Sequence, residues 1–243
     1  MRDDLVNELI SSLDSPIKEA VIGKKAAIAF SGGLDSGIVA LLSKRYADVT
    51  LYTVGVKDAY DVKAGEEMSA VLEMPWKHIE IDEKILEIEL PRMIRITGTV
   101  NPITLSFEVP LYFVLKLSEE SVVLGGQGAD ELFLGYSKYI GLDEEQFEAV
   151  LKEDMARLMN VTLNHERAVA EEFKKTLVHP YLNEKVVSLV ERMGISGVSV
   201  GDVRKPLLRD AAMMLGYPEL AEKPKKSAQY GSGTMVVLRS MAK

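Results

Sequence analysis

The sequence predicts an α/β fold, a doubly wound parallel sheet of five strands with helices on both faces. Between residues 25 and 124, short apolar runs typical of buried strands alternate with longer segments of helical periodicity. Strands joined by helices of this length pair in parallel, and connections of this kind are right-handed. The pattern therefore predicts a doubly wound sheet. Functional residues are expected where the strands of such a sheet end.

The individual elements follow in a regular order. Apolar side chains at helical spacing predict an N-terminal helix over residues 3–21, which Pro16 could kink. The expected strands lie at residues 25–30, 48–56, 76–82 and 121–126. The expected helices between them lie at residues 37–46, 61–74, 83–97 and 108–119, with a loop at residues 98–105.

Helical periodicity replaces the strand pattern after about residue 140. The apolar spacing predicts helices at residues 143–160, 165–178 and 183–193. We therefore expect three parts, which are an N-terminal helix at residues 1–21, an α/β domain at residues 22–140, and a helical lobe at residues 141–243. No repeat or linker separates them, so the lobe is expected to pack on the sheet.

Composition narrows the classes of function. The chain has 243 residues, a net charge of −8 and no cysteine. An acidic chain is a poor match for nucleic acid, and the lack of cysteine excludes disulfides, cysteine-bound zinc, iron–sulfur clusters and thiolate catalysis. No apolar run reaches the roughly 18 residues that a membrane helix needs, and the N-terminus has no signal-peptide pattern. We expect a cytoplasmic protein that acts on small molecules, without nucleic-acid or membrane partners.

The stretch SGGLDSG, residues 31–37, stands where the first strand becomes a helix. A glycine-rich turn at a helix N-terminus presents backbone N–H groups to an anion, and Gly32 and Gly33 have no Cβ to obstruct it. Ser31 and Ser36 add hydroxyl donors, which favours phosphate. Asp35 would repel phosphate unless a divalent cation lay between them, so Mg²⁺ is implied. The same residue types also serve as ordinary turn and cap residues, which is the structural alternative.

A second loop, GGQGADELFLGY at residues 125–136, follows the fourth strand and also carries a carboxylate, Asp130. Taken alone, Asp130 and Glu131 would be an ordinary acidic helix start. If the first and fourth strands are neighbours at the switch point of the sheet, Asp35 and Asp130 face each other across the crevice. They could then hold Mg²⁺ against a triphosphate.

These motifs resemble a known family. SGGLDS resembles the pyrophosphatase-loop (PP-loop) signature of the adenine nucleotide α-hydrolase-like ATP pyrophosphatases, and GGQGADELFLGY resembles the second motif of the asparagine synthetase synthase domain. The resemblance continues through NHERAVAEEFKKTLVHPYLNEKVV, KPLLRDAA and KPKKSAQYGSG, from about residue 22 to 235. It implies that a substrate carboxylate attacks ATP to give an acyl-adenylate and pyrophosphate. Ammonia or an amine then forms an amide and releases AMP.

The resemblance also implies roles for particular residues. Asp35 and Asp130 would hold Mg²⁺, and Lys225 would stabilise the charged intermediates. Gln127 stands where the family usually has a glutamate able to accept a proton from the attacking nitrogen, and an amide cannot serve as that base. The residues expected around ATP are Ala29, Ser31, Gly32, Gly33, Asp35, Ser36, Val54, Gly125, Gly126 and Lys205. Arg209 is a weaker candidate for phosphate, and the three histidines, His78, His165 and His179, show no metal-ligand spacing and are given no role.

The substrate and partners stay open at this point. Complete glutamine-dependent asparagine synthetases carry a glutaminase domain with an N-terminal cysteine, and the sequence shows neither. We therefore expect free ammonia, a separate glutaminase subunit or another amine as the nitrogen source, with aspartate as the first choice of acid. A homodimer is left open. The alternatives are a catalytically altered ATP-binding subunit that acts through a partner, and another PP-loop ligase resembling NAD synthetase.

Overall fold

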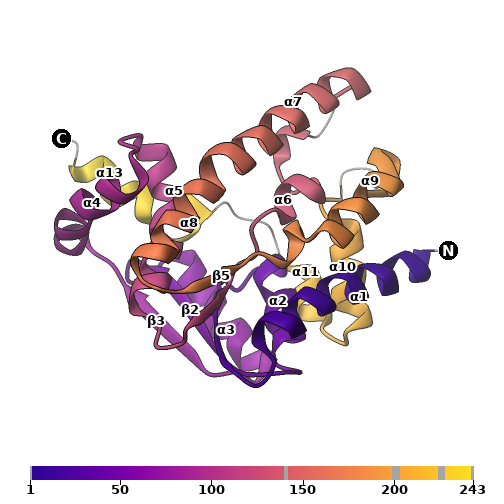
Figure 1. Ribbon diagram of the computed structural model, residues 1–243, viewed down its shortest axis with the longest axis horizontal. Helices are drawn as coiled ribbons and strands as arrows, with labels where there is room; N and C mark the ends of the chain where they lie inside the picture. Colours follow the sequence, from indigo (N-terminus) through magenta and orange to yellow (C-terminus); the bar gives the residue numbers. More distant parts are fainter. Residues whose placement is uncertain (1, 140–141, 199–202, 224–227, 242–243) are drawn as a thin grey trace.

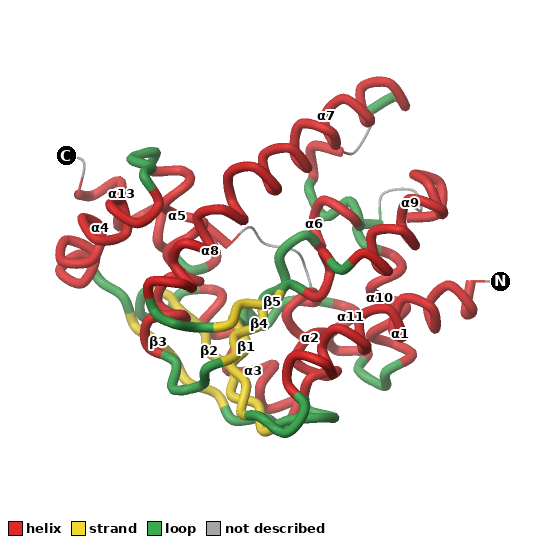
Figure 2. Tube along the Cα trace, in the orientation of Figure 1, coloured by secondary structure: helices red, strands yellow, loops and turns green. Residues whose placement is uncertain are grey.

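The structure is a computed structural model that describes residues 2–139, 142–198, 203–223 and 228–241. Five parallel strands form one sheet in the order β3-β2-β1-β4-β5. They are β1 (Lys25–Ala29), β2 (Asp48–Gly55), β3 (Trp76–Glu80), β4 (Val122–Leu124) and β5 (Thr176–Val178). Figure 2 shows the strands in the middle of the molecule with helices on both sides. The predicted fold class is confirmed.

The strand order places the switch point of the sheet between β1 and β4. β1 pairs with β2 on one side, where Ala27 is aligned with Thr50, and with β4 on the other, where Ala27 is aligned with Val123. After β3 the chain crosses back over the sheet to reach β4. The loops that follow β1 and β4 therefore leave adjacent strands at the same edge, which is where doubly wound proteins bind their ligands.

Side chains of the strands alternate between two buried layers, one on each face. Ala26 and Ile28 face one layer, and Ala27 between them faces the other. The helices that contribute to the first layer are α1 (Arg2–Val21), α2 (Leu34–Ser43), α3 (Tyr60–Leu72), α9 (Glu184–Val198), α10 (Pro206–Met214) and α11 (Pro218–Glu222). Those that contribute to the second are α4 (Glu83–Thr97), α5 (Pro102–Leu117), α8 (Leu163–Glu172) and α13 (Thr234–Met241). Helices from residues 141–243 thus cover both faces (Figure 1).

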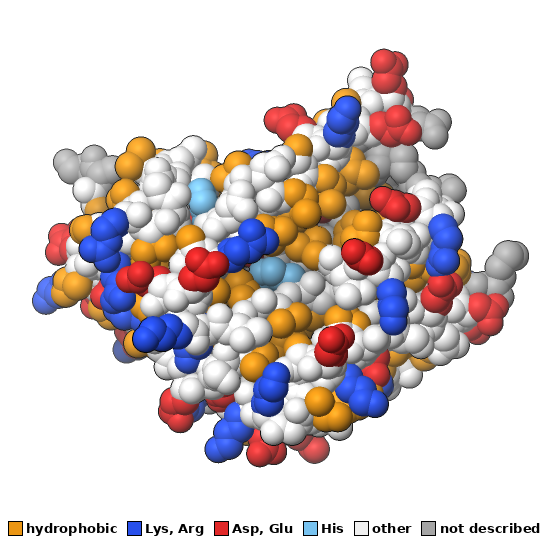
Figure 3. Space-filling view, viewed as in Figure 1, with side chains coloured by type: hydrophobic (Ala, Val, Ile, Leu, Met, Phe, Trp, Pro, Cys, Tyr) orange, Lys and Arg blue, Asp and Glu red, His pale blue; other side chains and the backbone are white. Residues whose placement is uncertain are grey.

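The remaining elements are short or extend away from the sheet. They are α6 (Ala129–Leu132), α7 (Glu144–Arg157), α12 (Ala228–Gly231), two 3₁₀ turns at Ser137–Tyr139 and Pro180–Leu182, and a π-helical turn at Leu158–Thr162. α7 projects from the body of the molecule at the top of Figure 1. Hydrophobic side chains gather between α7 and α9 on the face seen in Figure 3. Within the described residues, no helix has both the length and the apolar character needed to cross a membrane.

The helix expected at residues 108–119 begins six residues earlier (108 − 102). α5 starts at Pro102, because the Asn101 side chain accepts hydrogen bonds from the N–H groups of Ile103 and Thr104, at 2.9 and 3.4 Å. Proline is well suited to the first position of a helix, where its missing N–H would have no partner in any case. Pro102, expected in the loop at residues 98–105, is therefore the start of a helix.

The segment 165–178 was expected to be helical throughout, and that expectation is wrong at its end. α8 ends at Glu172, and residues 176–178 extend as β5 along β4, with Val122 aligned to Thr176 and Leu124 to Val178. Pairing with β4 satisfies backbone groups that a longer helix would have left open on that strand. Tertiary pairing therefore overrides the local helical pattern.

Candidate functional site

The glycine-rich loop after β1 is shaped by its contact with α3. Gly32 has a φ of +71°, and a Cβ there would lie 2.3 Å from the backbone carbonyl of Ala64. Only glycine fits this position without moving α3. The Ser31 hydroxyl accepts a hydrogen bond from the Gly33 N–H at 3.4 Å, and the Ser36 hydroxyl accepts one from the Ser31 N–H at 3.3 Å. α2 begins directly after this loop and directs the positive end of its dipole at it.

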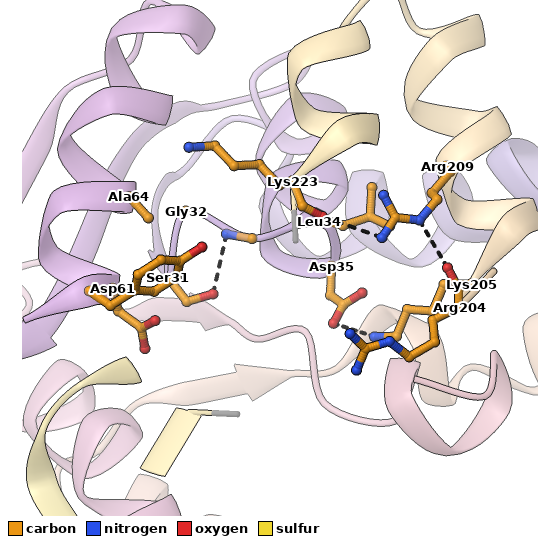
Figure 4. Close-up of a pocket in the computed structure, with 12 residues that line it drawn as sticks. Ser31, Gly32, Leu34, Asp35, Asp61, Ala64, Arg204, Lys205, Arg209 and Lys223 are labelled. Carbon is orange, nitrogen blue, oxygen red and sulfur yellow. Dashed lines mark hydrogen bonds and ion pairs between the residues drawn. The ribbon is translucent and has the colours of Figure 1, made fainter. Parts of the chain in front are cut away.

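Cationic side chains from the C-terminal segment face the loop. They surround a cavity of about 50 Å³ whose wall includes Ser31, Gly32, Gly33, Asp35, Arg204, Lys205, Arg209 and Lys223. Figure 4 shows Lys205 and Arg204 beside Asp35, with Lys223 on the other side of the loop. Backbone N–H groups, a helix N-terminus and several cations together favour an anion such as phosphate.

Arg209, the weaker candidate for phosphate, lines the smaller cavity and also binds backbone carbonyl groups. Its guanidinium donates hydrogen bonds to the backbone carbonyls of Arg204, at 2.9 Å, of Ala221 and of Lys223, at 3.3 Å. Burial, together with the nearby Arg204 charge, lowers the pKa of Arg209. Arg209 thus ties together the segments that carry the other cations.

A buried lysine joins the two aspartates that the motifs single out. The Nζ atom of Lys205 lies 2.5 Å from Oδ2 of Asp35 and 2.6 Å from Oδ1 of Asp130. Lys205 is 3% exposed, so the ammonium group has left bulk water and depends on these carboxylates for its charge balance. The structure therefore brings Asp35 and Asp130 together at one cation, and it places Lys205, expected near phosphate, between them.

Backbone contacts fix the separation of the two aspartate-bearing loops. A Cβ at Gly126 would lie 3.2 Å from Cβ of Asp35 and 3.3 Å from the backbone nitrogen of Ser36, so the loop after β4 lies directly against the start of α2. The Tyr181 hydroxyl donates a hydrogen bond to the Asp35 carbonyl at 3.1 Å. Asp35 is thus held from both sides by parts of the chain far from it in sequence.

A larger cavity of about 470 Å³ opens at the same edge of the sheet. Its volume is in the range of roughly 300–1,000 Å³ that is usual for small-molecule sites. Its wall includes these residues predicted from the sequence: Ala29, Ser31, Asp35, Ser36, Val54, Gly125, Gly126, Gln127 and Asp130. Gly32, Gly33 and Lys205 line the smaller cavity, and Ser31 and Asp35 line both. Lys225 lies outside the described residues.

The late glycine segment reaches the same edge of the sheet. The Val56 N–H, just after β2, donates a hydrogen bond to the Ser232 carbonyl at 2.9 Å. Ser232 is buried and belongs to GSG at residues 231–233, in the stretch matched to the family's lysine loop. This contact brings the described end of that stretch beside the cavity.

Several acidic groups line the larger cavity to which the sequence analysis assigns no role in the site. Glu108 of α5 and Glu166 of α8 are both buried, and His179 lies beside Glu166 with an Nε2 to Oε2 distance of 2.8 Å. The Tyr136 hydroxyl donates a hydrogen bond to Glu131 at 2.8 Å, and burial raises the pKa of Glu131. Glu108 could have been noticed, because it is the only acidic residue in the apolar segment 102–117.

Asp35 and Asp130 suit a divalent cation bound together with phosphate. Among the described residues, no group of three or more His, Cys, Asp or Glu side chains could hold a metal by itself. Mg²⁺ commonly takes one or two protein carboxylates and completes its shell with phosphate oxygens and water. The two aspartates already share one cation, Lys205, so their donor chemistry and spacing fit such an ion.

The fold and this site define a doubly wound α/β protein with an anion-binding loop after β1 and a paired carboxylate after β4. Comparison of sequences specifies the family. The model of the asparagine synthase family matches residues 18–175, and the chain belongs to this family of ATP-using ligases.

Curated relatives of this chain carry related names. A protein of Methanocaldococcus jannaschii, provisionally named a glutamine-hydrolyzing asparagine synthetase, is 28% identical over 287 aligned positions that cover 100% of this chain and 53% of that protein. An asparagine synthetase domain-containing protein of Drosophila melanogaster is 25% identical, with 86% and 44% covered. Asparagine synthetase domain-containing protein 1 of Mus musculus is 28% identical, with 73% and 33% covered. This chain therefore spans about half or less of the length of these relatives.

Proposed function

We propose that this chain is an amide-forming ligase that uses ATP to adenylate a carboxylate and then transfers the acyl group to ammonia or an amine. Aspartate is the first candidate for the acid. The observation that carries the proposal is the meeting of Asp35 and Asp130 at Lys205, beside the glycine-rich loop. Adenylation needs both an anion cradle and concentrated carboxylates for a metal at one place, and a purely structural turn needs neither.

Each part of the site has a proposed task. The loop residues Ser31, Gly32, Gly33 and Ser36 would bind the departing pyrophosphate, with Lys223 and Arg204 adding positive charge. Asp35 and Asp130 would hold Mg²⁺, which when bound offsets the charge on the phosphates. Lys205 would then turn from the carboxylates toward phosphate.

The adenosine and the acyl group would occupy the larger cavity. Ala29, Val54, Gly125 and Gly126 line it at the ends of three neighbouring strands, where backbone groups can contact the adenosine. We propose that Lys225 stabilises the charged intermediates, as the family match implies. A separate glutaminase or free ammonia would supply the nitrogen.

Exchange of labelled pyrophosphate into ATP tests the first half of the reaction. The protein is assayed with Mg²⁺ and a panel of amino and carboxylic acids, aspartate first. We expect acid-stimulated exchange that falls at least about a hundredfold in Asp35→Asn and Asp130→Asn, the loss typical of removing one transition-state contact. Asp14→Asn is the matched control, because Asp14 on α1 pairs with Arg45 and Tyr46, which follow α2, and lines neither cavity.

Two results would overturn the proposal. One is a lack of exchange with every acid in the panel, and the other is unchanged exchange in both aspartate variants. ATP binding without exchange, together with a partner recovered in stoichiometric amount, would instead identify an ATP-binding subunit.

A further inference from the structure

Two buried carboxylates, each beside an imidazole, form one end of the larger cavity. Oε1 of Glu108 lies 2.7 Å from Nδ1 of His165, and Oε2 of Glu166 lies 2.8 Å from Nε2 of His179. Glu108 is 6% exposed and Glu166 is 7% exposed, and both line the cavity of about 470 Å³. They come from two helices, α5 and α8, that pack together.

One of the carboxylate oxygens at this end of the cavity has no hydrogen-bond donor beside it in the part of the chain that the structure describes. Oε2 of Glu108 is buried and has no hydrogen-bond partner among the described residues. Burial raises the pKa of Glu108, and the negative charge of nearby Glu166 raises it further, against the opposing effect of His165. Since a buried polar atom without a partner is costly, this oxygen indicates a missing ligand that donates a hydrogen bond.

The groups around Glu108 and Glu166 indicate what kind of ligand fits. Arg157 lines the cavity and lowers the pKa of Glu108, so it offsets one carboxylate. Lys138 lies 2.6 Å from Asp154, so that pair is neutral by itself. Oε2 of Glu108 is the acceptor that remains without a donor among the described residues, so a small cation with hydrogen-bond donors fits beside it. A cation with N–H donors also satisfies the carboxylate oxygens directionally.

The chemistry of Gln127 connects this cation with the proposed reaction. It lines the same cavity, and its amide cannot accept a proton from an attacking nitrogen. We infer that Glu108 and Glu166 form the subsite for the nitrogen donor, which binds as ammonium or a small primary ammonium ion, and that they accept the protons it releases. This inference rests on the proposed function.

The proton balance requires two acceptors. The bound ammonium ion first gives one proton to the Glu166 carboxylate, and its freed lone pair attacks the acyl carbon. The bond from that carbon to the phosphate oxygen breaks, and its electron pair leaves with AMP. The nitrogen then loses a second proton, to Glu108, and both protons later pass to water. His179, which lies against Glu166 and beside Gly125, is a positioning residue that keeps the carboxylate directed into the cavity.

Variants that keep shape and remove charge test the subsite. Glu108→Gln and Glu166→Gln are compared with the wild type in two assays, pyrophosphate exchange and amide formation as a function of ammonium concentration. We expect exchange within about twofold of wild type and a tenfold or larger rise in the KM for ammonium. Glu120→Gln is the matched control, since Glu120 is buried, accepts a hydrogen bond from Tyr52 at 2.9 Å and precedes β4 at the opposite end of the sheet.

A binding measurement on the wild type does not depend on turnover or on the folding of variants. Methylammonium chloride should raise the melting temperature more than potassium chloride does at equal ionic strength, because potassium has no N–H donors. Both glutamine variants should lose this difference, and Glu120→Gln should keep it.

The outcomes separate this inference from the proposed function. Wild-type protein without exchange would overturn the proposed function. Normal exchange with an unchanged KM for ammonium in both variants would overturn the subsite alone. Equal melting temperatures of the wild type in the two salts would also count against it.

Discussion

Replacing Lys205 by methionine is the sharpest test of how the site is held together. The substitution keeps the length and apolar stem of the side chain and removes the ammonium that lies 2.5 Å from Asp35 and 2.6 Å from Asp130. Removing one partner from a buried ion pair typically costs about 3–5 kcal/mol, because the remaining charge stays buried. The aspartate side chains are 18% and 20% exposed, so water can partly return to them. We therefore expect the lower end, about 3 kcal/mol.

Equilibrium unfolding in urea, followed by far-UV circular dichroism, measures this cost. A loss of about 3 kcal/mol raises the unfolding equilibrium constant roughly a hundredfold. Lys77→Met is the matched control, because Lys77 pairs with Glu119 at 2.7 Å on the surface, where both side chains are largely exposed. Surface pairs of that kind contribute about 0–1 kcal/mol.

The interpretation also predicts coupling between the partners. In an Asp130→Asn background, Lys205→Met should cost clearly less than in the wild type, because one of its two carboxylates is already neutral. Equal losses of unfolding free energy in Lys205→Met and Lys77→Met would contradict this expectation. An unchanged cost of Lys205→Met in the Asp130→Asn background would contradict it as well.

The other two predictions concern the glycine loop and a buried acid. Gly32→Ala should lower the free energy of unfolding by about 1–3 kcal/mol more than Gly23→Ala, because both have a positive φ but only the Gly32 Cβ meets backbone, at 2.3 Å. It should also weaken ATP binding in calorimetry. Equal losses would show that α3 moves aside easily. Glu108→Gln should stabilise the ligand-free protein at pH 7. Burial raises the pKa of Glu108 in the folded protein, so this residue lowers the free energy of unfolding progressively as pH rises from the ordinary pKa of a glutamate through the raised pKa. Urea unfolding at pH 5 and pH 7 should show a smaller gain at the lower pH, and a loss at pH 7 would contradict the argument.

Most of the fold could be predicted because its central strands are apolar runs between clear turn signals. β1, β2 and β4 are largely buried, so local composition and tertiary environment agree there, whereas β3 is a partly exposed strand at the edge of the sheet. β5 could not be predicted in this way. Its three residues follow a helical pattern, and they become a strand only because β4 offers an edge to pair with.

The candidate site was predictable where chemistry is concentrated in short motifs. Asp35 and Asp130 each follow a strand in a glycine-rich loop, and adjacency of β1 and β4 was the condition for them to meet. Lys205 lies 170 residues after Asp35 in the chain, and nothing local indicates that its ammonium becomes buried between two aspartates. Glu166 and His179 likewise meet only through the packing of α8 beside the end of β5.

The position of β5 in the chain has a consequence for biosynthesis. β4 ends at Leu124 and β5 begins at Thr176, 52 residues later (176 − 124). At roughly 5–20 residues per second, a ribosome needs about three to ten seconds to deliver the missing strand. During that interval one edge of β4 has unpaired N–H and C=O groups that a neighbouring nascent chain could bind. Slower translation between these two strands should therefore increase aggregation, whereas slower translation after residue 178 should not.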